Sequence, residues 1–190
     1  ERAGVSTEHM LISCEQHSAA YMALLSPQRA LLVGVDDTAA TIALTPDYIQ
    51  DHAELLTQAR MVVIDANVPL ESAQLLLDIC QAANVPVALD PVAYGPALRY
   101  RELIGQFYLI TPNAVEAQAL TNLPISSPAQ GAIAAKQLVG MGVQIAIITL
   151  GEAGLVYATA NANGYVPAIE VEITDPTGAG DALTAAVVYA

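Results

Sequence analysis

Residues 61–90, MVVIDANVPLESAQLLLDICQAANVPVALD, predict a strand, a helix and a second strand in succession. The strands are expected at residues 61–65 and 85–90, two short apolar runs that each end on an aspartate, and the helix at residues 71–83. Strands that are apolar on both faces and alternate with helices are typical of a parallel sheet with helices packed on it. This stretch therefore predicts an α/β fold.

The same alternation continues through the C-terminal half of the chain. Further strands are expected at residues 107–110 and 144–150, and helices at 100–105, 114–121 and 128–141. Shorter, antiparallel strands are expected at 155–158 and 165–173, and a final helix near Gly178. The repeated pattern predicts a parallel-type sheet covered by helices on both faces.

The first 45 residues differ from the rest and predict β structure. Short apolar runs at residues 10–14, 17–25 and 29–35 are expected to be strands, with Ser26-Pro27-Gln28 as a hairpin loop between the last two. From Pro46 the pattern becomes helical as far as residue 59, with Thr45 as a candidate N-cap. We therefore expect a small β lid, on the substrate side, over residues 1–45 and an α/β core over residues 46–190.

Composition excludes several classes of protein. Of the 190 residues, 54% are hydrophobic, which excludes intrinsic disorder, and no apolar run is long enough to span a bilayer. Six Lys and Arg stand against 19 Asp and Glu, a net charge of −13 that repels nucleic acid and anionic membrane surfaces. An anionic small molecule remains feasible, because a helix N-terminus or a bound cation can reverse the field locally.

Cysteine and histidine usage predicts no metal site. Cys14 and Cys80 have no metal-ligand spacing, so we expect a reduced, cytoplasmic protein in which both are small buried hydrophobic residues. His9, His17 and His52 have no partners at ligand spacing and are expected on the surface or in packing contacts. The chain shows no signal peptide, begins without Met and ends on an apolar helix without a cap. We therefore expect a fragment of a longer protein that lacks N- and C-terminal parts.

The most specific motif is Asp175-Pro176-Thr177-Gly178-Ala179-Gly180-Asp181. Its two glycines let a ligand approach the backbone closely, and the small-residue helix that follows offers free N–H groups and a positive dipole end. Asp181 would lie in the first turn of that helix, where its carboxylate is stabilised in the ionised form. An ordinary glycine turn, with Asp181 as a helix-dipole partner, is the alternative.

Polar residues follow the other expected strands as well. They are Asp65-Ala66-Asn67, Asp90-Pro91, Thr111-Pro112-Asn113 and Thr149-Leu150-Gly151. Ligands of open parallel sheets bind beyond the carboxyl ends of the strands, so we expect these residues to converge on one edge. The sequence contains neither G-x-x-x-x-G-K-[ST] nor G-x-G-x-x-G, so neither a P-loop nor a Rossmann dehydrogenase is expected.

Residues 175–188 agree at every position with the C-terminal signature of the ribokinase-like, or PfkB, family of carbohydrate and nucleoside kinases, which the chain therefore resembles. The resemblance implies a ribokinase-like fold, here as one truncated kinase domain with a nucleotide-binding core. It implies that Gly178, Ala179 and Gly180 form the anion hole for the transferring phosphoryl group. It also implies that Asp181 is the catalytic base.

The resemblance assigns further residues to ATP and Mg²⁺. Asn113 lies near the phosphates and Glu116 helps to hold the Mg²⁺ hydration shell, although Asn at an N-cap with Glu three residues on is also a capping arrangement. Thr149 and Gly151 line the nucleotide phosphates, where an ordinary strand end is the alternative. Asp90 resembles an Asp near Mg²⁺, although an Asp before Pro is also common in turns.

Two residues resemble ligands of a monovalent cation such as K⁺, namely Asp175 and Thr177. Within the family, residues 19–25, 34–37, 44–49 and 65–67 look most like the bacterial pseudouridine kinases. The function expected from the resemblance is ATP-dependent phosphorylation of a hydroxymethyl group on a sugar or nucleoside, with pseudouridine as the acceptor. Another sugar kinase of the family, or a non-catalytic nucleotide-binding fragment, is the alternative. The lid is also a candidate contact surface for a homodimer.

Overall fold

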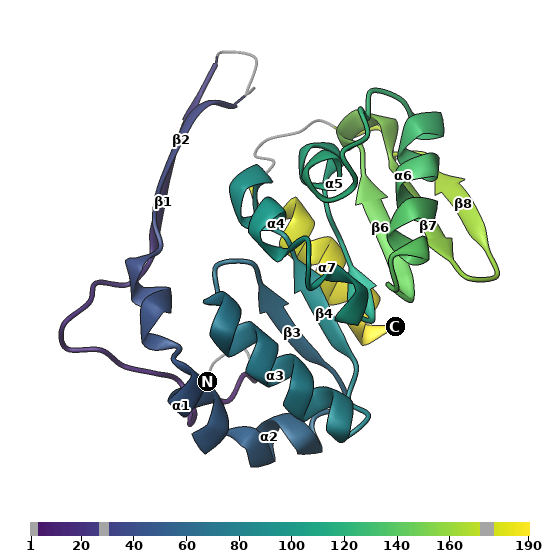
Figure 1. The fold of residues 1–190 in the computed structure, drawn as a ribbon. Coiled ribbons are helices and arrows are strands. Elements are labelled where there is room, and N and C mark those ends of the chain that lie inside the picture. The colour runs from purple at the N-terminus through teal and green to yellow at the C-terminus, as the bar shows by residue number, and fades with distance from the viewer. Residues whose placement is uncertain (1–3, 27–30, 172–176) are drawn as a thin grey trace.

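The computed structural model describes residues 4–26, 31–171 and 177–190. Its main element is a six-stranded sheet in the order β3-β4-β5-β6-β7-β8 (Figure 1). The strands are β3 Val62–Asp65, β4 Val87–Asp90, β5 Leu109–Ile110, β6 Ile145–Thr149, β7 Leu155–Thr159 and β8 Asn163–Val166. The first four are parallel, and β7 and β8 continue the sheet antiparallel. The expected parallel-type α/β sheet is confirmed.

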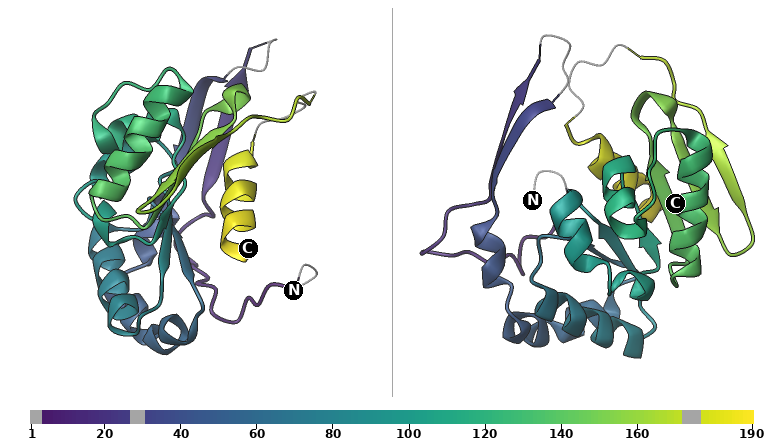
Figure 2. Two further views of the ribbon diagram at one scale, coloured as in Figure 1. Left: turned by 90° about the vertical axis from the view of Figure 1, so that its right-hand side faces the viewer. Right: turned by 45° about the horizontal axis from the view of Figure 1, so that its top comes forward.

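Helices cover the two faces of this sheet unequally. One face carries α3 Leu70–Ala82, α4 Tyr94–Tyr100, α5 Ala114–Thr121 and α6 Pro128–Gly140, and α1 Pro46–Asp51 and α2 Ala53–Gln58 pack against α3. The opposite face carries α7 Ala179–Tyr189 (Figure 2, left). Side chains alternate between the faces along a strand. Leu89 of β4 therefore belongs to the larger apolar cluster with α3 to α6, and Ala88 to the smaller cluster with α7.

Side chains that cap the helices define several of their starts. Thr45 accepts a hydrogen bond from the Tyr48 backbone N–H at the start of α1, and Ser127 accepts one from Gln130 at the start of α6. Each cap is followed by a proline at the first helical position, where a missing N–H costs nothing. Both caps confirm the starts expected from the sequence.

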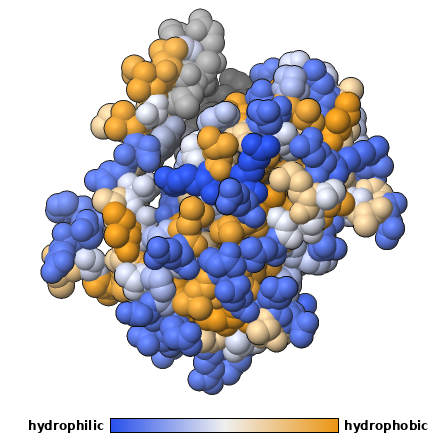
Figure 3. Space-filling model, viewed as in Figure 1, coloured by the Kyte–Doolittle hydropathy of each residue, from blue (hydrophilic) through white to orange (hydrophobic). Residues whose placement is uncertain are grey.

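The lid is a two-stranded antiparallel ribbon of β1 Ala20–Leu25 and β2 Leu31–Asp37, separate from the main sheet. Met22 pairs with Val35 and Leu24 with Val33, and all four side chains are more than half exposed. Apolar side chains accordingly stand out on the lid in Figure 3. Whether the lid is a separate structural unit and joins two copies of the chain stays a prediction.

Two expectations for the N-terminal part are wrong. Residues 10–14 form no strand, because no neighbouring strand pairs with them in the part of the chain that the structure describes. The helix expected from Pro46 is interrupted at His52, whose backbone leaves helical geometry. The Nδ1 atom of His52 lies 2.8 Å from the Tyr48 carbonyl oxygen, where it replaces the backbone N–H of a continuous helix.

Two further elements differ from the sequence-based expectation, and both contain or adjoin a proline. The helix expected at 100–105 is wrong in position, because α4 spans Tyr94–Tyr100 and is followed by a turn and a 3-10 helix at Ile104–Gln106. Pro96 lies in the first turn of α4, where proline is tolerated. β8 ends before Pro167, which has no N–H to donate to a sheet. Part of the strand expected at 165–173 and part of the hairpin loop at 26–28 lie outside the described residues.

Cysteine burial differs from the expectation at one position. Cys80 is fully buried on α3 as expected, but Cys14 is exposed, as are the residues on either side of it. Among the described residues, no helix is both long and apolar enough to cross a bilayer.

Candidate active site

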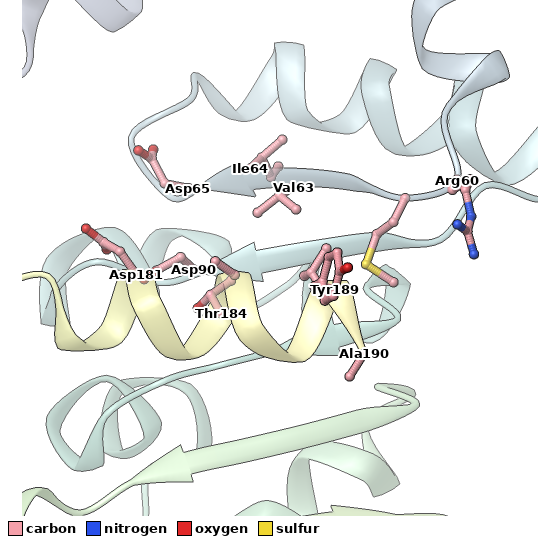
Figure 4. Close-up of a pocket in the computed structure, with 12 residues that line it drawn as sticks. Arg60, Val63, Ile64, Asp65, Asp90, Asp181, Thr184, Tyr189 and Ala190 are labelled. Carbon is pink, nitrogen blue, oxygen red and sulfur yellow. The ribbon is translucent and has the colours of Figure 1, made fainter. Parts of the chain in front are cut away.

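Three carboxylates line one end of a cavity of about 1080 Å³ between β3 and α7 (Figure 4). Asp65 and Asp90 are the last residues of β3 and β4 and are partners in the parallel register. Asp181 faces them from the first turn of α7. The expected convergence of strand ends on one edge is therefore observed for these residues.

Asp90 is held by the backbone of the turn that follows β4. Its Oδ1 atom accepts a hydrogen bond of 3.0 Å from the Val92 backbone N–H. Burial raises the pKa of Asp90, that hydrogen bond opposes the rise, and the nearby Asp181 and Asp65 charges add to it. Val92 has a φ of +66°, a conformation that is rare for a β-branched residue and costs of order 1–3 kcal/mol. The turn after β4 is therefore strained where it holds the Asp90 carboxylate.

Asn113 and Glu116 form a capping box at the N-terminus of α5. Asn113 Oδ1 accepts hydrogen bonds from the Val115 and Glu116 backbone N–H groups, at 2.9 and 3.0 Å. Glu116 Oε2 in turn accepts one of 2.8 Å from the Asn113 backbone N–H. The capping interpretation of this motif is therefore confirmed, and it is compatible with a second role beside a ligand.

Glu116 is also a buried carboxyl group, with 4% of its surface exposed. Burial raises its pKa from an ordinary 4.5 to about 7; the Asn113 hydrogen bonds oppose the rise and the Asp90 charge adds to it. The Glu116 side chain therefore changes charge near neutral pH, and a cation nearby would favour its ionised form.

The end of β6 lies beside this capping box. Thr149 forms an isolated parallel bridge with Asn113 and donates its backbone N–H to the Pro112 carbonyl at 3.0 Å. Gly151 has a φ of +59°, in the left-handed region that favours glycine. The structure thus brings together Asn113, Glu116 and Thr149, and Gly151 follows two residues later.

The N-terminus of α7 is rich in glycine. Gly178 is its N-cap, with a φ of +81°, and no side chain caps the first-turn N–H groups among the described residues. A Cβ atom built on Gly178 or Gly180 would meet nothing within 4 Å, so a ligand can approach this backbone. These features fit an anion such as a phosphate. Thr177 precedes this turn, whereas Asp175 lies outside the described residues.

The carboxylates do not form a closed metal cage. No group of three or more His, Cys, Asp or Glu side chains lies at metal-binding spacing in the described part of the chain. Mg²⁺ usually keeps several of its waters and needs only one or two protein carboxylates. Asp90 and Glu116 fit that kind of site, since the Asp90 charge is near enough to raise the pKa of Glu116.

One buried pair beside the site was not expected from the sequence. The hydroxyls of Thr111, after β5, and Thr184, on α7, lie 2.7 Å apart, and each residue is at most 6% exposed. The spacing of Thr184, three residues after Asp181, places both on the same side of one helix turn. Thr111 was expected at the same edge because it follows a strand, but neither signal identifies the two threonines as partners.

Known proteins resemble the chain along its whole length. A model of the pfkB family carbohydrate kinases matches residues 1–190. Pseudouridine kinase of Escherichia coli K12 is 29% identical over 185 residues, or 97% of this chain and 58% of that protein. Ribokinase of Bacillus subtilis 168 is 27% identical over 190 residues, or 98% of this chain and 59% of that protein.

A solved structure shares the fold. Arabidopsis thaliana ribokinase complexed with ribose and ATP superposes with a TM-score of 0.73 at 22% identity, over 90% of this chain and 55% of that one. The ribokinase-like fold is therefore confirmed, and the chain spans between half and three fifths of these relatives. The match over residues 1–190 shows that the chain belongs to the pfkB family of carbohydrate kinases.

Proposed function

We propose that the protein containing this chain transfers the γ-phosphoryl group of ATP to a hydroxymethyl group of a sugar or nucleoside. The observation that carries this proposal is the placement of Asp181 in the first turn of α7, after a glycine N-cap, where it faces the ends of β3 and β4. A base and an anion site then lie within one helix turn. That is the combination that transfer of a phosphoryl group to a hydroxyl requires.

Asp181 acts as the general base. Its carboxylate accepts the proton of the acceptor hydroxyl as the hydroxyl oxygen forms a bond to the γ-phosphorus and the bond from that phosphorus to the β–γ bridging oxygen breaks. The backbone N–H groups of residues 178–180 donate to the phosphoryl oxygens, whose charge they stabilise. Catalysis by this chain is then positioning and electrostatics, with no covalent intermediate.

The N-terminus of α5 and the end of β6 supply the nucleotide side of the site. Asn113, Thr149 and Gly151 are the residues that would contact the phosphates, and Asp90 and Glu116 those that would hold the water shell of Mg²⁺. When bound, Mg²⁺ supplies neutralisation of phosphate charge. Thr177, with Asp175, is our candidate for a K⁺ site, which predicts higher turnover in potassium than in sodium buffer.

Pseudouridine is the acceptor that we propose. The relative from E. coli named pseudouridine kinase matches 97% of the chain, although at only 29% identity. The lid and the segment after it, residues 44–49, carry the sequence features of this subgroup. An exposed ribbon of this kind is suited to close over a substrate and to exclude water.

The test uses the intact protein with ATP and Mg²⁺ and equal concentrations of pseudouridine, ribose, fructose and adenosine. We expect the highest kcat/KM with pseudouridine. A higher value for a free sugar or adenosine would refute the proposed acceptor and leave the kinase activity standing. Binding of ATP in a thermal-shift assay without turnover of any acceptor would refute the proposed reaction in favour of a non-catalytic nucleotide-binding protein.

Asp181→Asn tests the catalytic base. We expect kcat to fall by about 10²–10⁴, as for loss of a general base, with little change in nucleotide affinity. Asp78→Asn is the matched control, because Asp78 lies on α3, away from the cavity, and accepts a hydrogen bond from Gln74. Near-normal turnover of the Asp181 variant would mean that Asp181 acts only on the helix dipole.

A further inference from the structure

The α7 helix carries both the proposed base and the proposed anion site, so its exact placement matters for the reaction. Its apolar contacts come from Leu183, Val187 and Val188. They pack against the smaller apolar cluster of the sheet, which is formed by Ala88, Leu109 and Ile147. Apolar contacts are non-directional. They hold the helix against the sheet but do not by themselves fix its rotation or its position along its axis.

The Thr111–Thr184 hydrogen bond supplies a directional contact. Thr184 is the one α7 residue that is buried among those described, and its Oγ1 atom lies 2.7 Å from Thr111 Oγ1. Thr184 lines the same cavity as Asp181 and Asp90 (Figure 4). A buried hydroxyl is costly without a partner, so rotation or sliding of α7 that separates the two oxygens is disfavoured.

Thr111, the partner of Thr184, is fixed to the sheet and lies close in sequence to α5. Thr111 directly follows β5, and its backbone N–H donates to the Leu89 carbonyl oxygen at 3.3 Å. Two residues later, Asn113 begins α5 and binds Glu116. The bond therefore links the helix that carries Asp181 to the segment that carries Asn113 and Glu116.

We infer that the Thr111–Thr184 hydrogen bond is a positioning contact that aligns Asp181 and the first turn of α7 with the nucleotide side of the site. This inference rests on the proposed phosphoryl transfer. Thr111 and Thr184 touch no reacting atom; they act through Asp181. A displacement of about 1 Å in a catalytic group can cost about 100-fold in rate, so loss of one directional contact is enough to be measured.

Valine and serine variants separate positioning from simple stabilisation. Thr184→Val leaves the Thr111 hydroxyl buried and unpaired, so both the melting temperature and kcat should fall. The double variant Thr111→Val/Thr184→Val removes both hydroxyls, and replacing both partners by apolar groups of the same shape can be nearly neutral for stability. We expect the double variant to regain its melting temperature but to keep a kcat about 10–100-fold below wild type. Thr184→Ser, which keeps the hydroxyl, should retain most activity.

Thr121→Val is the matched control. Thr121 is 3% exposed, and its hydroxyl donates to the Ala117 carbonyl oxygen of its own helix at 2.6 Å. The chemical change is the same, but no contact between α7 and the sheet is lost. We expect kcat of this variant to stay within about twofold of wild type, because Thr121 lies at the far end of α5 from Asn113.

Steady-state kinetics and hydrogen exchange on the intact protein decide the inference. The KM for ATP should stay within about twofold while kcat falls, and peptides that cover residues 179–184 should exchange faster in the double variant than in Thr121→Val. Recovery of both melting temperature and kcat in the double variant would overturn it. If the wild type turns over no acceptor, the proposed reaction fails, and unchanged exchange at residues 179–184 would still refute the positioning contact.

Discussion

Glu116→Gln should change how the stability of the protein depends on pH. The rise in the Glu116 pKa from 4.5 to about 7, at about 1.4 kcal/mol per pH unit, corresponds to about 3 kcal/mol. Below pH 4.5 the carboxyl is protonated in both the folded and the unfolded state and contributes nothing. Between pH 4.5 and 7 the unfolded state ionises first, so the free energy of unfolding falls as pH rises. Above pH 7 the full cost of the buried charge remains.

The measurement is urea unfolding of the intact protein at steps from pH 5 to pH 8, without divalent cations. The glutamine variant cannot ionise. The difference in free energy of unfolding, variant minus wild type, should therefore increase by about 2–3 kcal/mol between pH 5 and pH 8. Loss of one hydrogen-bond acceptor shifts the variant by a constant amount and leaves the difference in slope intact. Glu71→Gln, an exposed carboxylate in the first turn of α3, controls for net charge. Parallel curves for wild type and Glu116→Gln would refute the reasoning.

Three further outcomes follow from the same geometry. Mg²⁺ should raise the melting temperature more at pH 8 than at pH 5.5, and Glu116→Gln should reduce that difference; equal shifts at both pH values would argue against a metal role. Gly105→Ala should cost about 1–3 kcal/mol in urea unfolding, because its Cβ would collide with the Met141 carbonyl oxygen, whereas Gly140→Ala, with open space, should cost nothing. Val92→Gly should raise the free energy of unfolding by about 1 kcal/mol through relief of strain, and a loss of stability would show that the turn is not strained.

The parts of the fold that local chemistry determines could be predicted from the sequence. α5 and α6 begin where Asn113 and Ser127 can accept hydrogen bonds from the first helical turn. The failures occur where tertiary contacts decide. Residues 10–14 have strand-like composition, but no strand among the described residues lies beside them. A side-chain hydrogen bond at His52 divides one predicted helix into two.

Some features of the candidate site could likewise be predicted from the sequence, and others could not. Asp65 and Asp90 could be predicted to meet, because the carboxyl ends of neighbouring parallel strands lie at one edge. Thr111 could be placed at that edge because it follows a strand, but Thr184 lies 73 residues further on and no local pattern pairs the two. The raised pKa of Glu116 depends on burial by the whole fold, which a local motif does not report.

β3 and β4 end at paired residues, Asp65 and Asp90, and this affects which form of ATP can bind. Neighbouring strands lie about 4.8 Å apart, and the backbone ladder holds Asp65 and Asp90 side by side, so the register concentrates two carboxylates at this edge. A bare nucleotide brings more negative charge to this edge, whereas a nucleotide already complexed with a cation brings less. We therefore expect isothermal titration to show tighter binding of Mg²⁺·ATP than of ATP in EDTA, with the preference weakened in Asp90→Asn. The strand register would then select for the Mg²⁺ complex of the nucleotide over the free nucleotide.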